Sequence, residues 1–357
     1  METTQTIILN RIITAALKRK ATDLHLSVGN NPILRVDNKL YVSSDEEIIT
    51  ADFLNNLAQS LLDEERMREL EKNREISIIH DYGNQIRVRI NGFYQKNFLT
   101  FSFRFISPVI PSPKILGLPR VINDLIGLKS GLIIVGGNYD SGRTTTVFSL
   151  LEEINRTQNR YILTLENPIE FLMASNKSIV LQRNITKDVN SYEDGLGYCE
   201  DEDVDVIMID RIDASQGVLL KAFELANSGK LVIGIINAGS VIGAIEKIMS
   251  EFDDNKKERA KFLFNNSLEC VFIQKLVPRI GGGRILVPEI LLATEPVRAI
   301  IKEGRIYQLN NILQTSREEG MRGIDRSLAD LVSTGEISLD DALEYANNKD
   351  SFQIMMK

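Results

Sequence analysis

Four short apolar runs between residues 131 and 237 constrain the fold of this chain most strongly. They are rich in β-branched residues, they have the length of buried strands, and stretches that favour helices lie between them. The runs are GLIIVGG (131–137), YILTLE (161–166), VDVIMID (204–210) and KLVIGIIN (230–237). Strands of this kind that alternate with helices predict an α/β unit, built on a parallel sheet with helices on its faces.

The segment between the first run and a helix predicted over residues 142–156 has the spacing of a phosphate-binding loop, G-x-x-x-x-G-K-[ST]. In such a loop the backbone N–H groups hold phosphate, the lysine reaches the β- and γ-phosphates, and the hydroxyl holds Mg²⁺. An ordinary glycine-rich turn between a strand and a helix is the alternative. The candidate nucleotide-binding residues are Gly137, Asn138, Tyr139, Asp140, Ser141, Gly142, Arg143, Thr144 and Thr145, with Thr144 as the candidate Mg²⁺ ligand.

Two residues of this loop depart from the pattern. Arg143 stands where the lysine belongs, and its wide, forked guanidinium cannot replace a compact ammonium without shifting the phosphates. Asp140 adds a carboxylate to a loop that has to surround an anion, and like charges repel most strongly where water is excluded. We therefore expect the geometry of a phosphate loop with weakened phosphate binding.

The N-terminal third has a different pattern, with short strands that alternate or run apolar. The sequence predicts helices over 4–20 and 51–72, strands over 23–28, 33–37, 39–42, 76–80, 85–90 and 98–106, and a turn at Tyr82-Gly83-Asn84. This order predicts a small domain over residues 1–106 with a mainly antiparallel sheet.

Residues 107–119 hold four of the nine prolines of the chain. Because proline fixes φ and removes a hydrogen-bond donor, this stretch is predicted to be an extended linker. A second domain then covers residues 120–357. From about residue 255 onward helical patterns dominate this domain, interrupted by a turn at Gly281-Gly282-Gly283.

Charge and composition exclude some classes of function. The formal net charge is −7, and it is spread along the chain, which argues against a nucleic-acid partner because phosphate backbones need a basic face. No apolar run approaches the roughly 20 residues that a membrane-spanning helix needs, and no signal peptide is visible. The two cysteines are far apart, which fits a reducing cytosol, and two histidines make a histidine-based metal site a poor hypothesis.

Several motifs, in the same order, resemble those of the type IV pilus retraction ATPase family, the PilT-like branch of the type II/IV secretion NTPases. In the first domain these are ATDLHLS (21–27), ILRVD (33–37) and RINGF (89–93). In the second domain they are LTLENPIEF (163–171), QR (182–183), IGGGR (280–284), PEI (288–290) and PVRAIIKE (296–303).

The resemblance implies a PAS-like N-terminal α+β domain followed by a RecA-like P-loop NTPase domain. It also implies a hexameric ring, cytoplasmic docking at the inner face of the plasma membrane on a pilus platform protein, and hydrolysis of ATP with Mg²⁺ coupled to pilus disassembly. By the same resemblance, Glu166 matches the catalytic glutamate, and Arg89 and Arg104 match two of three arginines that reach the neighbouring subunit's phosphates.

Other positions of the family's site are changed in this chain. The third inter-subunit arginine falls at Asn97, and the Mg²⁺-linked glutamate of the Walker B segment has become Arg211. Asp210 precedes it, but adjacent residues of a strand face opposite sides, so Asp210 is not expected to replace that glutamate. Further family positions are occupied by Asn167, Gly197, Asp201, Lys230 and Asn237.

Two hypotheses follow from this uneven match. In the first, the chain is a catalytically impaired PilT-like subunit with a structural or regulatory role, as a homohexamer or with an active PilT-like paralogue. In the second, it is an active retraction motor with an atypical P-loop. The first is favoured because phosphoryl transfer depends on positioning and on charge neutralisation, which are the properties that the changes affect.

Overall fold

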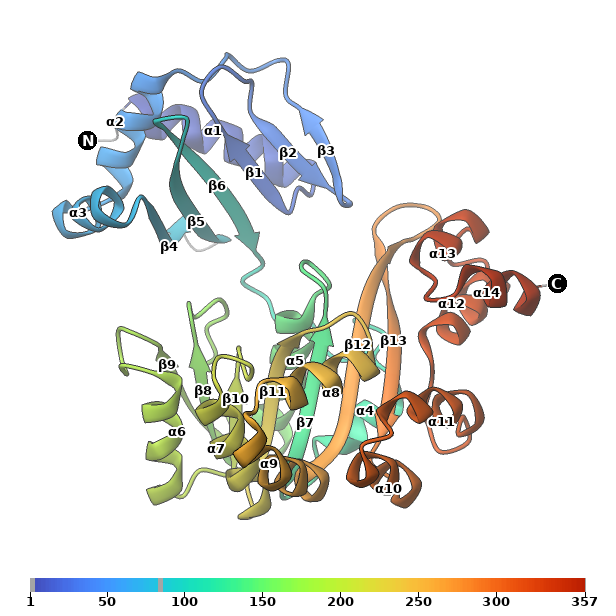
Figure 1. Ribbon diagram of the computed structural model, residues 1–357. Helices are drawn as coiled ribbons and strands as arrows, with labels where there is room; N and C mark the ends of the chain where they lie inside the picture. Colours follow the sequence, from blue (N-terminus) through green and yellow to red (C-terminus); the bar gives the residue numbers. More distant parts are fainter. Residues whose placement is uncertain (1–3, 83–85, 357) are drawn as a thin grey trace. The chain divides into compact units, whose positions relative to one another are not determined.

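The computed structural model describes residues 4–82 and 86–356 (Figure 1). The chain divides into two compact units. One comprises Met1–Val109 with the short segment Glu170–Leu172, and the other comprises Ile110–Ile169 with Met173–Lys357. Each unit has its own sheet and its own hydrophobic core.

The first unit contains a six-stranded antiparallel sheet in the order β3-β2-β1-β6-β5-β4. Its strands are β1 (Asp23–Leu26), β2 (Ile33–Val36), β3 (Lys39–Val42), β4 (Glu75–Tyr82), β5 (Ile86–Gln95) and β6 (Phe98–Ile106). The antiparallel sheet predicted from the sequence is confirmed. The turn predicted at Tyr82-Gly83-Asn84 falls between β4 and β5 in the sequence, and Gly83 and Asn84 lie outside the described residues.

Three helices pack with this sheet: α1 (Thr4–Lys18), α2 (Ala51–Leu61) and α3 (Glu64–Asn73). Their apolar side chains join those of the strands in one core, with Leu9, Leu54, Leu57, Phe101 and Phe103 completely buried. Burial of large apolar side chains is the main stabilising contribution in a domain of this size.

The single helix predicted over residues 51–72 is wrong, because the chain breaks at Leu62 and Asp63. Both residues have extended backbones, and the Asp63 side chain accepts a hydrogen bond from the Arg66 backbone N–H at 2.9 Å. This contact is an N-cap, which stabilises the start of a new helix. The region therefore forms α2 and α3 instead of one helix.

The second unit is built on a seven-stranded sheet in the order β13-β12-β7-β11-β10-β8-β9. Its strands are β7 (Gly131–Gly137), β8 (Tyr161–Glu166), β9 (Ile179–Asn184), β10 (Val206–Ile209), β11 (Leu231–Asn237), β12 (Leu268–Pro278) and β13 (Arg284–Leu292). All neighbouring strands are parallel except β12 and β13. The predicted parallel sheet is confirmed.

Helices surround this sheet (Figure 1): α4 (Arg120–Leu125), α5 (Arg143–Thr157), α6 (Tyr192–Asp201), α7 (Gln216–Asn227), α8 (Val241–Ser250), α9 (Asp254–Ser267) and α10 (Glu295–Glu303). The C-terminal part adds η1 (Ile306–Gln308), α11 (Leu309–Thr315), α12 (Ile324–Ser333), α13 (Leu339–Tyr345) and α14 (Lys349–Met355). Every residue of β7 is buried, as expected for a central strand covered on both faces.

The expectation that helical patterns dominate from residue 255 is wrong for residues 268–292. There β12 and β13 form a long antiparallel hairpin, and the Gly281-Gly282-Gly283 turn lies between these two strands. All three glycines have positive φ, between 77° and 100°, which other residues rarely adopt. Because β12 also pairs with β7 inside the sheet, most of its residues are buried and its sequence does not alternate.

The predicted linker at 107–119 is only partly extended. Residues 112–118 form a hydrogen-bonded turn in which the Leu118 N–H donates to the Pro113 carbonyl at 3.0 Å. Leu118 is buried, and Pro119 precedes the first residue of α4. The division between the two compact units falls between Val109 and Ile110.

Candidate functional site

The parallel strands β7, β11, β10 and β8 place their carboxyl ends at one edge of the sheet. Ligand sites of open α/β sheets lie at this edge. Gly137 ends β7 and pairs with Asn237 at the end of β11. Glu166 ends β8, and the Asp210 N–H after β10 donates to the neighbouring Leu165 carbonyl at 3.1 Å. The sheet thus gathers the phosphate loop, Glu166 and Asp210 at the same edge.

The loop between β7 and α5 has the compact form that its two glycines predict. Gly142 has φ of 83° immediately before α5, a conformation that favours glycine. A Cβ atom at Gly137 would lie 2.6 Å from the Gln274 carbonyl oxygen, so no side chain fits there without movement. The Gln274 amide also donates to the Ser141 carbonyl at 2.5 Å, which ties the loop to β12.

The side chains of the loop lie in different environments. Asn138 and Tyr139 are exposed, whereas Thr144 and Thr145, in the first turn of α5, are partly buried. Arg143 turns toward the end of β11, where its Nη1 donates to the Ile236 carbonyl at 2.8 Å. The cation at the lysine position therefore interacts with a backbone carbonyl of the sheet.

Asp140 has an ion-pair partner that the sequence did not predict. Its Oδ2 accepts from Arg284 Nη1 at 2.7 Å, and both side chains are largely shielded from water. Arg284 is the first residue of β13, directly after the three glycines of the hairpin turn. The carboxylate in the loop is therefore offset by a guanidinium, and its repulsion of phosphate is smaller than the sequence alone suggests.

Glu166, the residue that matches the catalytic glutamate, lies buried within a hydrogen-bond network. Its Oε1 accepts from Thr164 Oγ1 at 2.7 Å and from Gln182 Nε2 at 3.0 Å. Gln182 Oε1 in turn accepts from the Met173 N–H at 2.8 Å. These contacts hold the carboxylate in one position at the end of β8, as required of a group that orients a water molecule.

Asp210 and Arg211 lie past the end of β10, which finishes at Ile209. The argument that they face opposite sides of a strand therefore does not apply to them. The Asp210 carboxylate accepts from the Asn167 N–H at 2.6 Å and from the Tyr192 hydroxyl. Burial and the neighbouring Asp210 charge raise the pKa of Tyr192, so its hydroxyl stays protonated. Arg211, which the resemblance to the family matches with the Mg²⁺-linked glutamate, is exposed.

The fit to Mg²⁺ is incomplete. Thr144 is placed at the start of α5, where a P-loop hydroxyl ligand belongs. The Asp210 carboxylate, however, is engaged in two internal hydrogen bonds, and Arg211 brings a cation where a divalent metal needs acidic neighbours. Within residues 4–82 and 86–356, no three His, Cys, Asp or Glu side chains are grouped to hold a metal ion.

The two candidate inter-subunit arginines belong to the first unit. Arg89 lies on β5 with its Nε 3.4 Å from Ser77 Oγ, and Arg104 pairs with it across the strands β5 and β6. Arg104 Nη1 lies 3.9 Å from Oδ1 of Asp23, which is buried. The sheet therefore brings the two arginines side by side.

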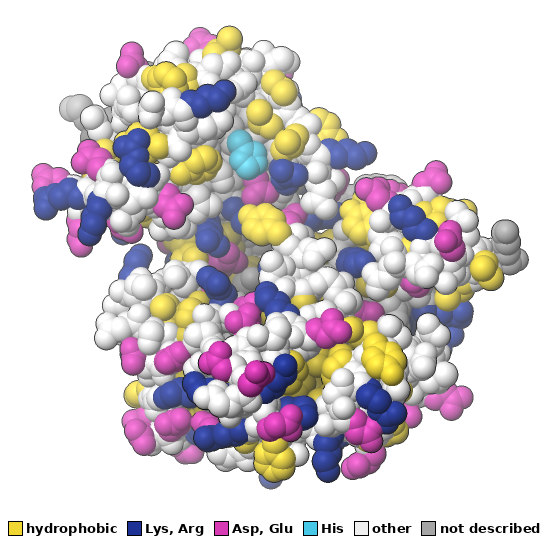
Figure 2. Space-filling view, in the orientation of Figure 1, with side chains coloured by type: hydrophobic (Ala, Val, Ile, Leu, Met, Phe, Trp, Pro, Cys, Tyr) yellow, Lys and Arg dark blue, Asp and Glu magenta, His cyan; other side chains and the backbone are white. Residues whose placement is uncertain are grey.

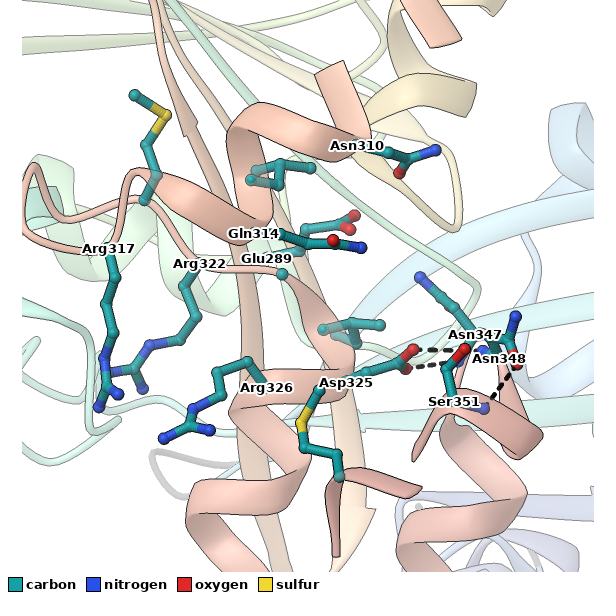
Figure 3. A pocket seen from close by; sticks show the side chains of 15 residues that line it. Glu289, Asn310, Gln314, Arg317, Arg322, Asp325, Arg326, Asn347, Asn348 and Ser351 are labelled. Atoms are coloured by element: carbon teal, nitrogen blue, oxygen red, sulfur yellow. Dashed lines mark hydrogen bonds between the residues drawn. The ribbon is translucent and has the colours of Figure 1, made fainter. Parts of the chain in front are cut away.

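A pocket of about 780 Å³ lies elsewhere in the second unit, among β13, α11, α12 and α14 (Figure 3). No residue of the phosphate loop lines it. Asp325, on its wall, accepts from the backbone N–H groups of Asn347 and Asn348, and the buried Glu289 accepts from the Val241 N–H at 2.7 Å. The three arginines on its wall, Arg317, Arg322 and Arg326, all lie within 4 Å of Asp330.

Comparison with known proteins assigns the family. Residues 118–282 match the family "Type II/IV secretion system protein". A twitching motility protein of Neisseria gonorrhoeae is 30% identical over 321 residues, which cover 90% of this chain and 85% of that protein. The chain belongs to the PilT-like type II/IV secretion NTPases.

Two further PilT-like proteins cover nearly the whole chain. The type IV pilus retraction ATPase PilT of Pseudomonas aeruginosa is 29% identical over 96% of this chain and 99% of its own length. The crystal structure of a pilus retraction motor PilT with bound ADP is 31% identical, with a TM-score of 0.83 over 97% of this chain and 98% of that one. The predicted fold, an N-terminal domain followed by a RecA-like domain, is confirmed.

The sequence predicted which elements form this PilT-like site, but several of their partners were missed. Gln274 and Tyr192 gave no recognisable signal, because each acts through a contact with another element. Thr164 belongs to the LTLENPIEF motif, but its hydrogen bond to Glu166 was not predicted. Arg284 belongs to the IGGGR motif, so the sequence marked it as a family residue, but the sequence did not predict that it lies beside the phosphate loop.

Proposed function

We propose that this chain is a subunit of a type IV pilus retraction assembly, active in twitching motility, with a nucleotide site that turns over ATP slowly or not at all. It acts as a structural or regulatory subunit, as a homohexamer or in a ring with an active PilT-like paralogue. We place it in the cytoplasm, peripheral to the inner face of the plasma membrane, on the pilus platform protein and not on nucleic acid.

Family membership supports the pilus assignment, and the cations of the site support the impairment. Arg143 is hydrogen-bonded to the Ile236 carbonyl, so its charge is not presented as a compact ammonium over the β- and γ-phosphates. Arg211 stands at the metal-linked position. Of these, the Arg143 contact is the observation on which the proposal chiefly rests, because the P-loop lysine is a direct phosphate ligand.

Two general features of the chain support the remaining parts of the proposal. Lys and Arg side chains are interspersed with Asp and Glu over the face shown in Figure 2, which fits the net charge of −7 and a protein partner. In the described part of the chain, no helix has the length and hydropathy to cross a membrane.

An active motor is the second candidate, and two contacts favour it. Glu166 is held by Thr164 and Gln182, as a catalytic glutamate has to be, and the Asp140 charge is offset by Arg284. The two candidates differ in the rate of hydrolysis. Measuring ATP binding and ATP turnover side by side on the purified chain distinguishes them: binding without appreciable turnover supports the impaired subunit, and turnover at the rate of ordinary enzymes supports the motor.

A further inference from the structure

The ion pair between Asp140 and Arg284 joins the phosphate loop to the β12–β13 hairpin. Arg284 Nη1 lies 2.7 Å from Asp140 Oδ2 and 3.3 Å from the Asp140 carbonyl oxygen. The exposed fractions are 16% for the Arg284 side chain and 13% for that of Asp140. A shielded pair at this distance is stronger than a typical surface pair, which water and salt screen.

Asp140 lies in the part of the loop where a P-loop binds phosphate. Asp140 has φ of 63°, in the left-handed region that aspartate and asparagine tolerate better than most residues. Gly142 and the start of α5 follow within three residues, where backbone N–H groups form the anion-binding end of a P-loop. The guanidinium that contacts Asp140 is therefore beside the space in which phosphate would bind.

A second observation at the loop also indicates a ligand. Ser141 is buried, and its Oγ has no hydrogen-bond partner within residues 4–82 and 86–356. A buried hydroxyl without a partner costs free energy, and such groups are normally satisfied by a ligand, an ion or water. Ser141 directly follows Asp140, so the hydroxyl without a partner and the carboxylate that contacts Arg284 belong to the same loop.

The simpler explanation is that the pair has only a structural role and fastens the hairpin to the loop. The hairpin, however, has another ion pair that fastens it to the rest of the unit, because Arg279 Nε lies 2.6 Å from Glu336 Oε2. Arg284 differs from Arg279 in its partner, which belongs to the loop that binds phosphate in this family. A guanidinium forms two parallel hydrogen bonds with phosphate as well as with carboxylate, so the two anions compete for the same group.

We propose that Arg284 is a phosphate-binding residue of this nucleotide site, and that Asp140 is an internal anion that competes with the nucleotide for it. Nucleotide binds when its phosphate replaces the Asp140 carboxylate on Arg284. This inference rests on one part of the proposed function, namely that the loop is a nucleotide site. It does not depend on the rate at which the chain hydrolyses ATP.

The test is a cycle of variants on the full chain, with ADP and Mg-ATP as the probes and titration calorimetry as the readout. Asp140→Asn keeps the size of the side chain and its tolerance of positive φ, but removes the charged competitor. One charge-assisted hydrogen bond gained by the nucleotide corresponds to an affinity increase of about tenfold. Arg284→Gln added to Asp140→Asn is expected to abolish that increase. The matched control is Glu336→Gln, which removes the partner of Arg279 on the same hairpin and is expected to leave affinity unchanged.

Three outcomes overturn the inference: unchanged affinity in Asp140→Asn, an increase that persists in the double variant, or an equal increase in Glu336→Gln. Persistence in the double variant would mean that Asp140 acts only by repelling the nucleotide. Thermal unfolding of each variant checks that it is folded. If Arg284→Gln does not fold, Arg284→Lys keeps the charge without the fork, and loss of most of the increase is again expected. ADP binding requires no hydrolysis. Rapid ATP turnover by the chain would therefore contradict the proposed function, but it would not change the ADP affinities measured in this test.

Discussion

Arg284 Nη1 lies 2.7 Å from Asp140 Oδ2, so the carboxylate that stands inside the phosphate loop is paired with a guanidinium from the β12–β13 hairpin. This contact changes how the loop is understood. Asp140 by itself suggests electrostatic repulsion of a nucleotide, whereas the pair is close to neutral and withholds a cation. On the proposal made above, weak nucleotide binding is expected to follow mainly from this competition within the protein, together with the cations at Arg143 and Arg211.

The joint between the two units is predicted to be the site most accessible to proteases. Residues 112–118 are held in a hydrogen-bonded turn, which leaves 107–111 as the extended part of the proline-rich stretch. Within it, only the Val109–Ile110 bond has no proline on either side. A protease of broad specificity should cut within 107–119, and first at this bond, to give two resistant fragments in mass spectrometry. A single resistant core that spans the joint would disprove the boundary.

Assembly into a ring, alone or with an active PilT-like paralogue, is expected to depend on Arg89. Its side chain has two long contacts, with Ser77 Oγ at 3.4 Å and with Glu170 Oε1 at 3.4 Å, so Arg89→Gln should leave the sheet intact and shift light scattering toward smaller species. The dissociation constant should rise about tenfold or more, as for a charged residue at an interface. Arg68→Gln, on the exposed face of α3, is the control. A chain that stays monomeric both alone and with an active family member would contradict the prediction.

Stability should depend on pH through Glu289, whose pKa is raised chiefly by burial. A carboxyl with a raised folded-state pKa stabilises the folded state most below its unfolded pKa, and that contribution is lost as pH rises through the folded value. Glu289→Gln keeps an acceptor for the Val241 N–H without the charge. The variant should therefore gain stability relative to the wild type as pH rises from acid to neutral, as measured by urea unfolding. The exposed Glu318→Gln is the control, and a difference that is constant with pH would refute this account.

Restoring the family's residues at three positions should restore part of the chemistry. Arg143→Lys, Asp140→Gly and Arg211→Glu together are expected to raise turnover about tenfold or more, because groups that act as a unit show non-additive effects. Each single change is expected to alter binding while leaving turnover near the wild-type value. The triple variant still has Asn97 at the position that the resemblance matches with the third inter-subunit arginine. Loss of such an arginine costs about 10³–10⁵ in rate, so recovery should be incomplete. Equal turnover in the triple variant and the wild type would contradict this explanation.

The sequence predicted most of the central sheet because β7, β8, β10 and β11 are buried apolar runs with clear boundaries. It did not predict β12, because a strand buried on both faces lacks alternation and its length also suits a helix. The break at Asp63 was readable as an N-cap within a helical stretch and was missed.

The candidate site was only partly predictable, for a different reason. The loop residues follow from their spacing, and Glu166 follows from the family motif. The partners that set their properties come from distant parts of the chain, since 144 residues separate Asp140 from Arg284 and 93 separate Arg143 from Ile236. Contacts of this range depend on how the strands are ordered in the sheet, which local patterns do not specify.

The rate of ATP hydrolysis by the unmodified chain tests the central claim most directly. It should be measured at saturating ATP with Mg²⁺, on protein shown to be folded and assembled, with a hydrolysing PilT-like protein as the positive control. We predict turnover far below ~1 s⁻¹, which is near the lower end of ordinary enzymes, and little stimulation by Mg²⁺. Turnover of ~1 s⁻¹ or faster would contradict the impaired-subunit account and establish the chain as an active motor.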